Sequence, residues 1–222
     1  GSPRELLTLS LYIPPRAVVP KPNSDDPLDY YYRPVTGTIY RSRLQCAVDL
    51  LGPAKLGSLL EVGTGSGILL PELSRHTDRL VAIDIHPKLA EVRAFLEKEG
   101  VEATVVQGSL FEMPFEDGEF DGLLCASVLE HLTDLDGALK EFARVVRPGG
   151  SVILGFPVRN IVTDTFFRLA HFNPRDIHPS SHRDIVAAVK RCAGLELISS
   201  VALPSLLPLD LSLYEVCGCR RR

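Results

Sequence analysis

The sequence predicts an α/β fold, a three-layer αβα sandwich in which helices cover both faces of a mostly parallel sheet. Two observations lead to this prediction. Strand-like and helix-like segments alternate from residue 58 onward. The strand-like segments are continuously apolar, which is typical of strands that are buried on both faces. In doubly wound sheets of this kind, ligands bind at the carboxyl ends of the strands, where the strand order reverses.

Seven segments have the composition of strands, and turn residues or helices separate them. Helices are expected where apolar residues recur at three- and four-residue spacing. Capping boxes at Thr133–Asp136 and Ser181–Asp184 mark two helix starts. The expected strands are 58–64, 80–85, 103–107, 120–127, 151–156, 195–201 and 212–219, and the expected helices are 38–51, 66–75, 87–99, 134–147 and 181–193.

The expected organisation is one domain that follows a proline-rich segment. Seven of the 17 prolines lie in the first 34 residues, which is typical of extended chain. We therefore expect residues 1–36 to be extended and residues 37–222 to form the domain. Residues 157–180 and 200–212 are expected to be insertions on the substrate side of the sheet.

The composition is that of a soluble globular protein, with 45% hydrophobic residues, 23% charged residues and a net charge of −4. This charge provides no basic field for nucleic acid, so the expected partner is a small molecule. No apolar run approaches the roughly 20 residues of a membrane span. The apolar run near the start is too short for a secretory signal. A monomer or a homodimer is expected.

The five cysteines predict reduced thiols and a cytoplasmic location, because their number is odd and they are scattered along the chain. Cys217 and Cys219 are two residues apart and would lie on one face of a strand. No further cysteine or histidine close to them in sequence completes a ligand set, so no metal site is expected.

Three glycines follow the first strand in Glu61-Val62-Gly63-Thr64-Gly65-Ser66-Gly67. Glycines between a strand and a helix allow a sharp turn and let a ligand contact the backbone. The dinucleotide fingerprint needs a small residue where Ile68 stands. A carboxylate as close as Glu61 would also repel a pyrophosphate, whereas it would attract a cation.

This segment resembles the first motif of the class I S-adenosylmethionine-dependent methyltransferases, E/D-x-G-x-G-x-G, at every fixed position. The resemblance covers about residues 59–156. It implies a Rossmann-like sheet of seven strands whose last strand is antiparallel. It also implies S-adenosyl-L-methionine as cofactor and S-adenosyl-L-homocysteine as product. The glycine loop, which comprises Gly63, Thr64, Gly65 and Gly67, would then lie under the amino-acid part of the cofactor, with Glu61 near its ammonium and sulfonium groups.

The resemblance assigns further cofactor contacts to the ends of the next strands. Asp84 would accept hydrogen bonds from both ribose hydroxyls, although an aspartate there also suits a helix cap. Ile85 would flank the adenine. Ser109 stands where the family usually has an acid, which puts more weight on the Leu110 backbone. Ser127 would face the methyl group.

Catalytic candidates are His131, His178 and His182, with bracing or solvated roles as the alternatives. A general base is needed only if the acceptor must lose a proton. His182 falls in the first turn of a helix, where the helix dipole favours a neutral imidazole.

Substrate contacts are predicted at Tyr32, Tyr40, Glu130 and Phe156, in segments that are richer in aromatic and aliphatic residues than most loops. These segments could instead form core or a subunit contact. Tyr40 could also reach the cofactor, and Arg41 or Arg43 could bind its carboxylate.

The leading functional hypothesis is methyl transfer, in line, to a small apolar or amphiphilic molecule. One alternative is a module that binds S-adenosylmethionine without catalysis. A second alternative is an NAD-dependent oxidoreductase, which Ile68 and Glu61 disfavour.

Overall fold

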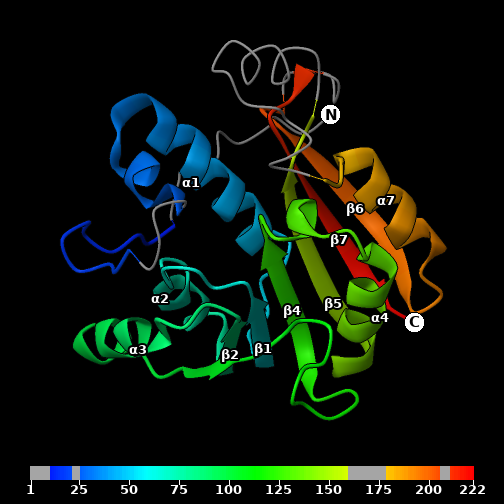
Figure 1. Cartoon of the computed structure of the whole chain (residues 1–222), viewed down its shortest axis with the longest axis horizontal. Helices are drawn as coiled ribbons and strands as arrows, with labels where there is room; N and C mark the ends of the chain where they lie inside the picture. The colour runs from blue at the N-terminus through cyan, green and yellow to red at the C-terminus, as the bar shows by residue number, and fades with distance from the viewer. Residues whose placement is uncertain (1–10, 22–25, 160–178, 206–210) are drawn as a thin grey trace.

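The computed structural model describes residues 11–21, 26–159, 179–205 and 211–222. One seven-stranded sheet runs through it in the order β3-β2-β1-β4-β5-β7-β6 (Figure 1). β7 is antiparallel to both of its neighbours, and the other paired strands are parallel. The strands are β1 Leu56–Val62, β2 Thr77–Asp84, β3 Thr104–Gln107, β4 Phe120–Ala126, β5 Val146–Pro157, β6 Leu195–Leu203 and β7 Tyr214–Arg221.

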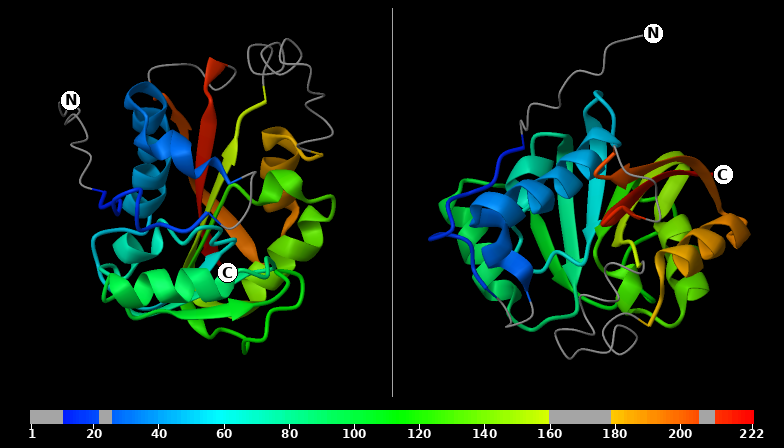
Figure 2. Two further views of the ribbon diagram at one scale, coloured as in Figure 1. Left: turned by 60° about the vertical axis from the view of Figure 1, so that its left-hand side comes forward. Right: turned by 90° about the horizontal axis from the view of Figure 1, so that it is seen from above.

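Helices cover both faces of the sheet, as predicted (Figure 2). One apolar cluster joins α1, α2 and α3 to one face, and a second joins α4 and α7 to the other. Both clusters take alternate residues of the same strands, as Leu59 and Leu60 of β1 illustrate. The helices are α1 Pro34–Asp49, α2 Leu70–Leu73, α3 Leu89–Lys98, α4 Leu135–Val145 and α7 His182–Arg191, with 3₁₀ helices η1 Pro27–Tyr32 and η2 Leu129–His131.

The bounds of the predicted helices differ from the structure, most of all at three of them. α1 begins at Pro34 rather than at residue 38, so it starts inside the segment that was expected to be extended. The helix expected over 66–75 is reduced to α2, because the loop before it continues in tight turns, with Gly67 N donating to Thr64 O at 2.8 Å. α4 ends at Val145, and β5 begins at Val146 rather than at residue 151. Its cap is Asp134, whose carboxylate accepts from Gly137 N at 2.8 Å, and not Thr133. The capping box at the start of α7 is confirmed.

The described part of the N-terminal segment packs on the α1–α3 face of the sheet. Leu28 and Tyr31 are buried in the same apolar cluster as α1. Tyr12 N donates to Glu72 Oε2 at 2.9 Å, which ties the segment to α2. Residues 27–32 form η1, which differs from the extended chain expected there. Within the described ranges, no helix combines the length and the hydropathy that a bilayer crossing requires.

Candidate functional site

A cleft of about 350 Å³ lies at the carboxyl ends of β1, β2 and β4. The chain leaves β1 toward β2 and β3 and then returns to β4 on the other side, so the strand order reverses here. This is the position at which doubly wound sheets bind ligands. The lining residues are Asp26, Pro27, Tyr31, Arg43, Leu44, Glu61, Gly63, Thr64, Gly65, Ser66, Ile68, Leu69, Asp84, Ala126, Ser127, Val128 and His131.

The three glycines of the loop have different roles, although all three have positive φ angles of 79°, 51° and 74° along the chain. A Cβ on Gly63 would overlap the Val128 side chain, and one on Gly67 would lie 2.7 Å from Val92 Cγ1 of α3. A Cβ on Gly65 would meet only the tip of Asp26, at 3.3 Å. Gly63 and Gly67 therefore permit close packing, and Gly65 presents bare backbone to the cleft.

Substitution by alanine should separate these two roles. Gly67→Ala is expected to lower the free energy of unfolding by about 1–3 kcal/mol, because overpacking adds to the cost of a positive φ. Gly65→Ala should cost less stability but weaken cofactor binding more, since its methyl group lies in the cleft. Thermal unfolding and calorimetric titration of both variants measure the difference. Equal binding losses in both variants would contradict it.

Glu61 is buried beneath the loop, with 5% of its surface exposed. Its carboxyl accepts a hydrogen bond from Thr64 Oγ1 at 2.6 Å. Burial raises the pKa of Glu61 to about 8; the Thr64 bond opposes this shift and the nearby Asp84 charge adds to it. A cationic ligand bound nearby would stabilise the ionised form of this buried carboxyl group, to which one side chain, Thr64, donates.

Asp84 fixes the glycine loop to the end of β2. Its Oδ2 accepts from Gly65 N at 2.8 Å, and its Oδ1 accepts from His86 N at 3.1 Å. His86 Nε2 lies 2.9 Å from Gly65 O, so both the N–H and the carbonyl of Gly65 are hydrogen-bonded to residues at the end of β2. Each carboxylate oxygen keeps one further acceptor direction, which suits a pair of neighbouring hydroxyls.

A third acid, Asp26, closes the cleft from the N-terminal segment. It caps η1 by accepting from Leu28 N at 2.9 Å, and it also accepts from the backbone and side chain of Ser66. Burial raises its pKa, and these hydrogen bonds oppose the shift. Asp26 could not be predicted from the sequence, because it lies in the proline-rich segment and reaches the loop only through the tertiary fold.

Arg43 is the basic residue of the cleft lining, and aromatic rings surround it. Its guanidinium carbon lies 4.2, 5.2 and 5.4 Å from the ring centroids of Tyr40, Tyr214 and Tyr31. Its Nη2 donates to Tyr31 Oη at 2.7 Å, while its buried Nε has no hydrogen-bond acceptor. Burial alone would lower its pKa, but the phenols of Tyr31 and Tyr214 raise it above the ordinary value. A carboxylate entering the cleft would find a fixed cation there.

Ser127, at the end of β4, has a φ of 59°, the one positive φ of a non-glycine residue in the described chain. Its Oγ lies 2.9 Å from Tyr214 Oη, and its N–H donates to Gly155 O at 2.8 Å. Backbone strain at a strand end beside a cleft is typical of functional positions. Ser127 and Arg43 therefore both contact Tyr214, from which the Arg43 guanidinium lies 5.2 Å.

Glu130 and His131 follow in η2. His131 lines the cleft, and its side chain is half-exposed, with Nε2 4.0 Å from Glu130 Oε1. Glu130 is 3% exposed, and its Oε2 has no hydrogen-bond partner. Burial raises the pKa of Glu130 to about 7, and the charge of Arg43 opposes this shift. His131 thus lines the cleft, whereas Glu130, which was predicted as a substrate contact, lies next to His131 and outside the cleft lining.

The structure thus brings together in the cleft lining Glu61, Gly63, Thr64, Gly65, Asp84, Ser127 and His131. It places other predicted residues outside this lining. Ile85 is 74% exposed and lies outside the lining. Gly67, Ser109 and Leu110 lie beyond the lining, and Tyr40 stacks against Arg43 behind it.

Three predicted residues have structural contacts instead. Phe156 is fully buried in the core against α4 and α7, and it does not line the cleft. Tyr32, which was predicted as a substrate contact, donates to Pro14 O at 2.7 Å and does not line the cleft. Its neighbour Tyr31 lines the cleft instead. His182 is buried, and its Nδ1 accepts from Arg159 N at 3.2 Å, which puts the proton of a neutral ring on Nε2. His178 lies outside the described residues.

The cleft fits a ligand with a positively charged centre, a diol and a carboxylate. Glu61, Asp84 and Asp26 supply three carboxyl groups, and Arg43 supplies one guanidinium. Gly65 supplies bare backbone between them. This donor and acceptor set suits the amino-acid and ribose parts of a sulfonium nucleoside, whereas the acids would repel a pyrophosphate. Among the residues that the structure describes, no group of three or more potential metal-binding side chains gathers.

Comparison with known proteins gives a family match for the part of the chain that holds the glycine loop. Residues 60–154 match the family model described as "Methyltransferase domain". A demethylmenaquinone methyltransferase of Roseiflexus castenholzii is 36% identical over 106 residues, which are 47% of this chain and 44% of that protein. The chain spans about half the length of the curated relatives it matches.

Two solved structures share the fold at low sequence identity. One is N-methyltransferase NodS from Bradyrhizobium japonicum in complex with S-adenosyl-L-homocysteine, with a TM-score of 0.69 and 20% identity. The superposition covers 90% of this chain and 94% of the NodS chain. Geranyl diphosphate C-methyltransferase from Streptomyces coelicolor has a TM-score of 0.69 and 17% identity and covers 96% of this chain and 92% of its own. An N-methyltransferase and a C-methyltransferase thus share this fold.

Proposed function

Because the chain belongs to the class I S-adenosylmethionine-dependent methyltransferase family, with S-adenosyl-L-methionine as its cofactor, we propose that it methylates a small apolar or amphiphilic molecule. The observation that carries the cofactor assignment is that the cleft is lined both by the buried acid Glu61 and by the bare backbone of Gly65. A monomer or homodimer in the cytoplasm remains a prediction.

Each part of the cofactor has a counterpart in the cleft. Asp84 would accept from the ribose hydroxyls, and Arg43 would bind the carboxylate. Glu61 would attract the ammonium and sulfonium end. The cofactor supplies a methyl group that its own positive sulfur already activates. The protein has to align donor and acceptor, which can lower the barrier by about 7–11 kcal/mol.

The acceptor would approach past Ser127 and His131, at the end of β4. Relatives that are named for quinone precursors, and a structural neighbour named for geranyl diphosphate, support an apolar or amphiphilic acceptor. The exposed apolar side chains of Tyr30, Val35 and Ile39, on η1 and the start of α1, agree with such an acceptor. Glu130 would take the proton of an acceptor that must lose one.

A titration followed by a transfer assay tests the proposal. Micromolar binding of S-adenosyl-L-homocysteine, with no binding of NADH, is expected from calorimetry. The protein and the methyl donor are then incubated with prenylated hydroquinones, phenols and amines, and the products are read by mass spectrometry. Binding without transfer to any acceptor would favour a non-catalytic module. Binding of NADH alone would overturn the proposal.

Asp84→Ala is expected to weaken binding of S-adenosyl-L-homocysteine by about 1.5–3 kcal/mol, the range for lost hydrogen bonds to a charged group. Asp78→Ala is the matched control, since Asp78 is an exposed acid of the same strand that pairs with Lys55. Calorimetric titration of both variants measures the difference. An unchanged dissociation constant in Asp84→Ala would remove Asp84 from the ribose site.

A further inference from the structure

The loop between β3 and β4, residues 108–119, is anchored at two points. Gly108 N donates to Asp84 O at 3.0 Å, which fixes the first anchor at the end of β2. Met113 forms the second anchor: its side chain is buried in the core, and its N–H donates to Glu141 Oε1 of α4 at 2.7 Å. Residues 109–112 form an arch between the two anchors.

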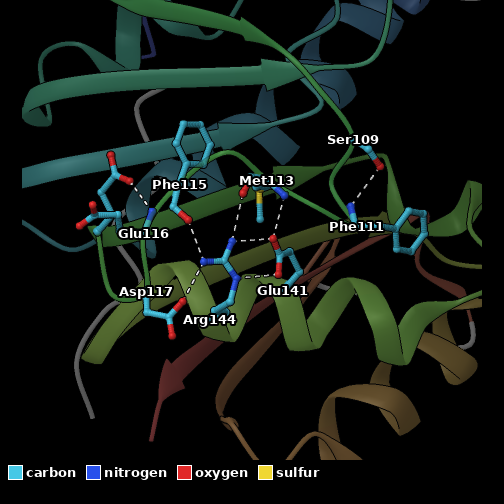
Figure 3. A network of polar contacts seen from close by, with 9 residues as sticks. Ser109, Phe111, Met113, Phe115, Glu116, Asp117, Glu141 and Arg144 are labelled. Atoms are coloured by element: carbon cyan, nitrogen blue, oxygen red, sulfur yellow. Dashed lines mark hydrogen bonds and ion pairs between the residues drawn. The ribbon is translucent and has the colours of Figure 1, made fainter.

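Arg144 of α4 secures the second anchor, as Figure 3 shows. Its Nη2 donates to Met113 O at 3.1 Å, and its Nη1 donates to Phe115 O at 2.7 Å and to Asp117 Oδ1 at 2.8 Å. One guanidinium thus forms hydrogen bonds to three residues of the loop, Met113, Phe115 and Asp117. A lysine ammonium has no planar fork and could not make these bonds together.

Glu141 orients this guanidinium and joins the same anchor. It accepts from Arg144 Nε at 2.8 Å and from Nη2 at 2.7 Å, in a bidentate pair. The same carboxylate accepts from Met113 N, so the ion pair and the loop backbone share one acid. Arg144 lowers the pKa of Glu141, mainly through these hydrogen bonds.

The arch itself is a short turn. Ser109 Oγ accepts from Phe111 N at 3.2 Å, and Ser109 O accepts from Glu112 N at 3.4 Å. So short an arch has little freedom once both anchors are fixed, and its position follows theirs. The family resemblance puts Ser109 and Leu110 beside the adenine of the cofactor.

From these contacts we infer that Arg144 and Glu141 are positioning residues for adenine recognition: they act through Met113 to set where the Ser109–Leu110 backbone lies. The inference rests on the proposed function, because the adenine belongs to the proposed cofactor. Neither residue lines the cleft, so any effect on cofactor selectivity must pass through the loop.

The test compares two ligands that differ only at the purine, S-adenosyl-L-homocysteine and S-inosyl-L-homocysteine. Wild-type protein should prefer the adenine ligand. Arg144→Lys keeps the charge but loses the fork, and it should weaken binding of the adenine ligand about tenfold, the value of one charge-assisted hydrogen bond, with a smaller effect on the inosine ligand. The ratio of the two dissociation constants is the readout, because a general loss of stability would leave it unchanged.

Arg191→Lys is the matched control. Arg191 also pairs with an acid of α4, Asp136, at 3.0 Å, but it does not bond the loop. Glu141→Gln is the second variant, should Arg144→Lys fail to fold. An unchanged ratio in a folded variant would overturn the inference, whereas a wild-type protein that binds neither ligand would overturn the proposed function instead.

Discussion

Glu130→Gln is expected to lower methyl transfer by about 100- to 10,000-fold, the range for loss of a general base, while cofactor affinity stays unchanged. Glu130 is buried in η2, which follows β4, and its Oε2 has no hydrogen-bond partner. Glutamine keeps the shape of the side chain but cannot take a proton. A prenylated hydroquinone is the acceptor of choice, because its hydroxyl groups carry protons.

The pH dependence gives a second readout. Burial raises the pKa of Glu130 to about 7, so the carboxylate that acts as base forms only as the pH rises through this value. Transfer by wild-type protein should therefore increase from acid to neutral pH and level off above it, whereas the variant should lack this step.

Glu72→Gln is the matched control for Glu130→Gln. Glu72 is also buried, but it bonds Tyr12 N and lies away from the cleft. Wild-type transfer rates are expected for this variant. If Glu130→Gln transfers methyl groups at the wild-type rate, Glu130 is not the base.

Glu61→Gln is expected to weaken cofactor binding by about 1.5–3 kcal/mol, the value of hydrogen bonds to a charged group, and to stabilise the protein at alkaline pH. The glutamine oxygen can still accept from Thr64, so the loop keeps its internal bond. What is lost is the negative charge beneath the cationic end of the cofactor.

The effect of Glu61→Gln on stability follows from the sign of the pKa shift. Burial raises the pKa of Glu61 from 4.5 to about 8 in the folded protein. The protonated side chain therefore stabilises the fold fully below about pH 4.5, and this contribution is lost as the pH rises through about 8. The loss has an upper bound of about 5 kcal/mol at 1.36 kcal/mol per pKa unit.

Thermal unfolding at two pH values tests this trade-off. At about pH 9 the variant should melt several degrees above the wild type, since 1 kcal/mol corresponds to about 2–4 °C in a domain of this size. At about pH 5 much of this difference should disappear, because Glu61 is then protonated in the folded protein. A melting-temperature difference that is the same at both pH values would show that ionisation of Glu61 does not control stability.

The sheet and the glycine loop could be predicted from the sequence because their signals are local. Apolar runs mark the strands, and each polar residue that follows a strand comes to the same edge of a parallel sheet. Glu61, Asp84 and Ser127 were found in this way. The short α2 was not, because Gly67 and the turns around it are compatible with a helix start at the level of sequence.

The other wall of the cleft depends on contacts between residues that are distant in sequence. Three consecutive tyrosines precede α1, and only the turn of η1 determines that Tyr31, and not Tyr32, faces the cleft. Asp26 precedes α1 in the sequence and Ser66 of the glycine loop follows it, so only the tertiary fold brings these two residues into contact. Phe156 illustrates the opposite error, because a strand end beside a ligand site also carries residues that point into the core.

The family match begins at residue 60, yet Asp26, Tyr31 and Arg43 come from the chain before it. The binding site is therefore complete only when this earlier part of the chain has docked on the sheet. Ligand binding and docking are then thermodynamically coupled, so that each favours the other. Cofactor binding should therefore slow amide hydrogen exchange in η1 and α1, although the glycine-loop motif at residues 61–67 lies outside both elements.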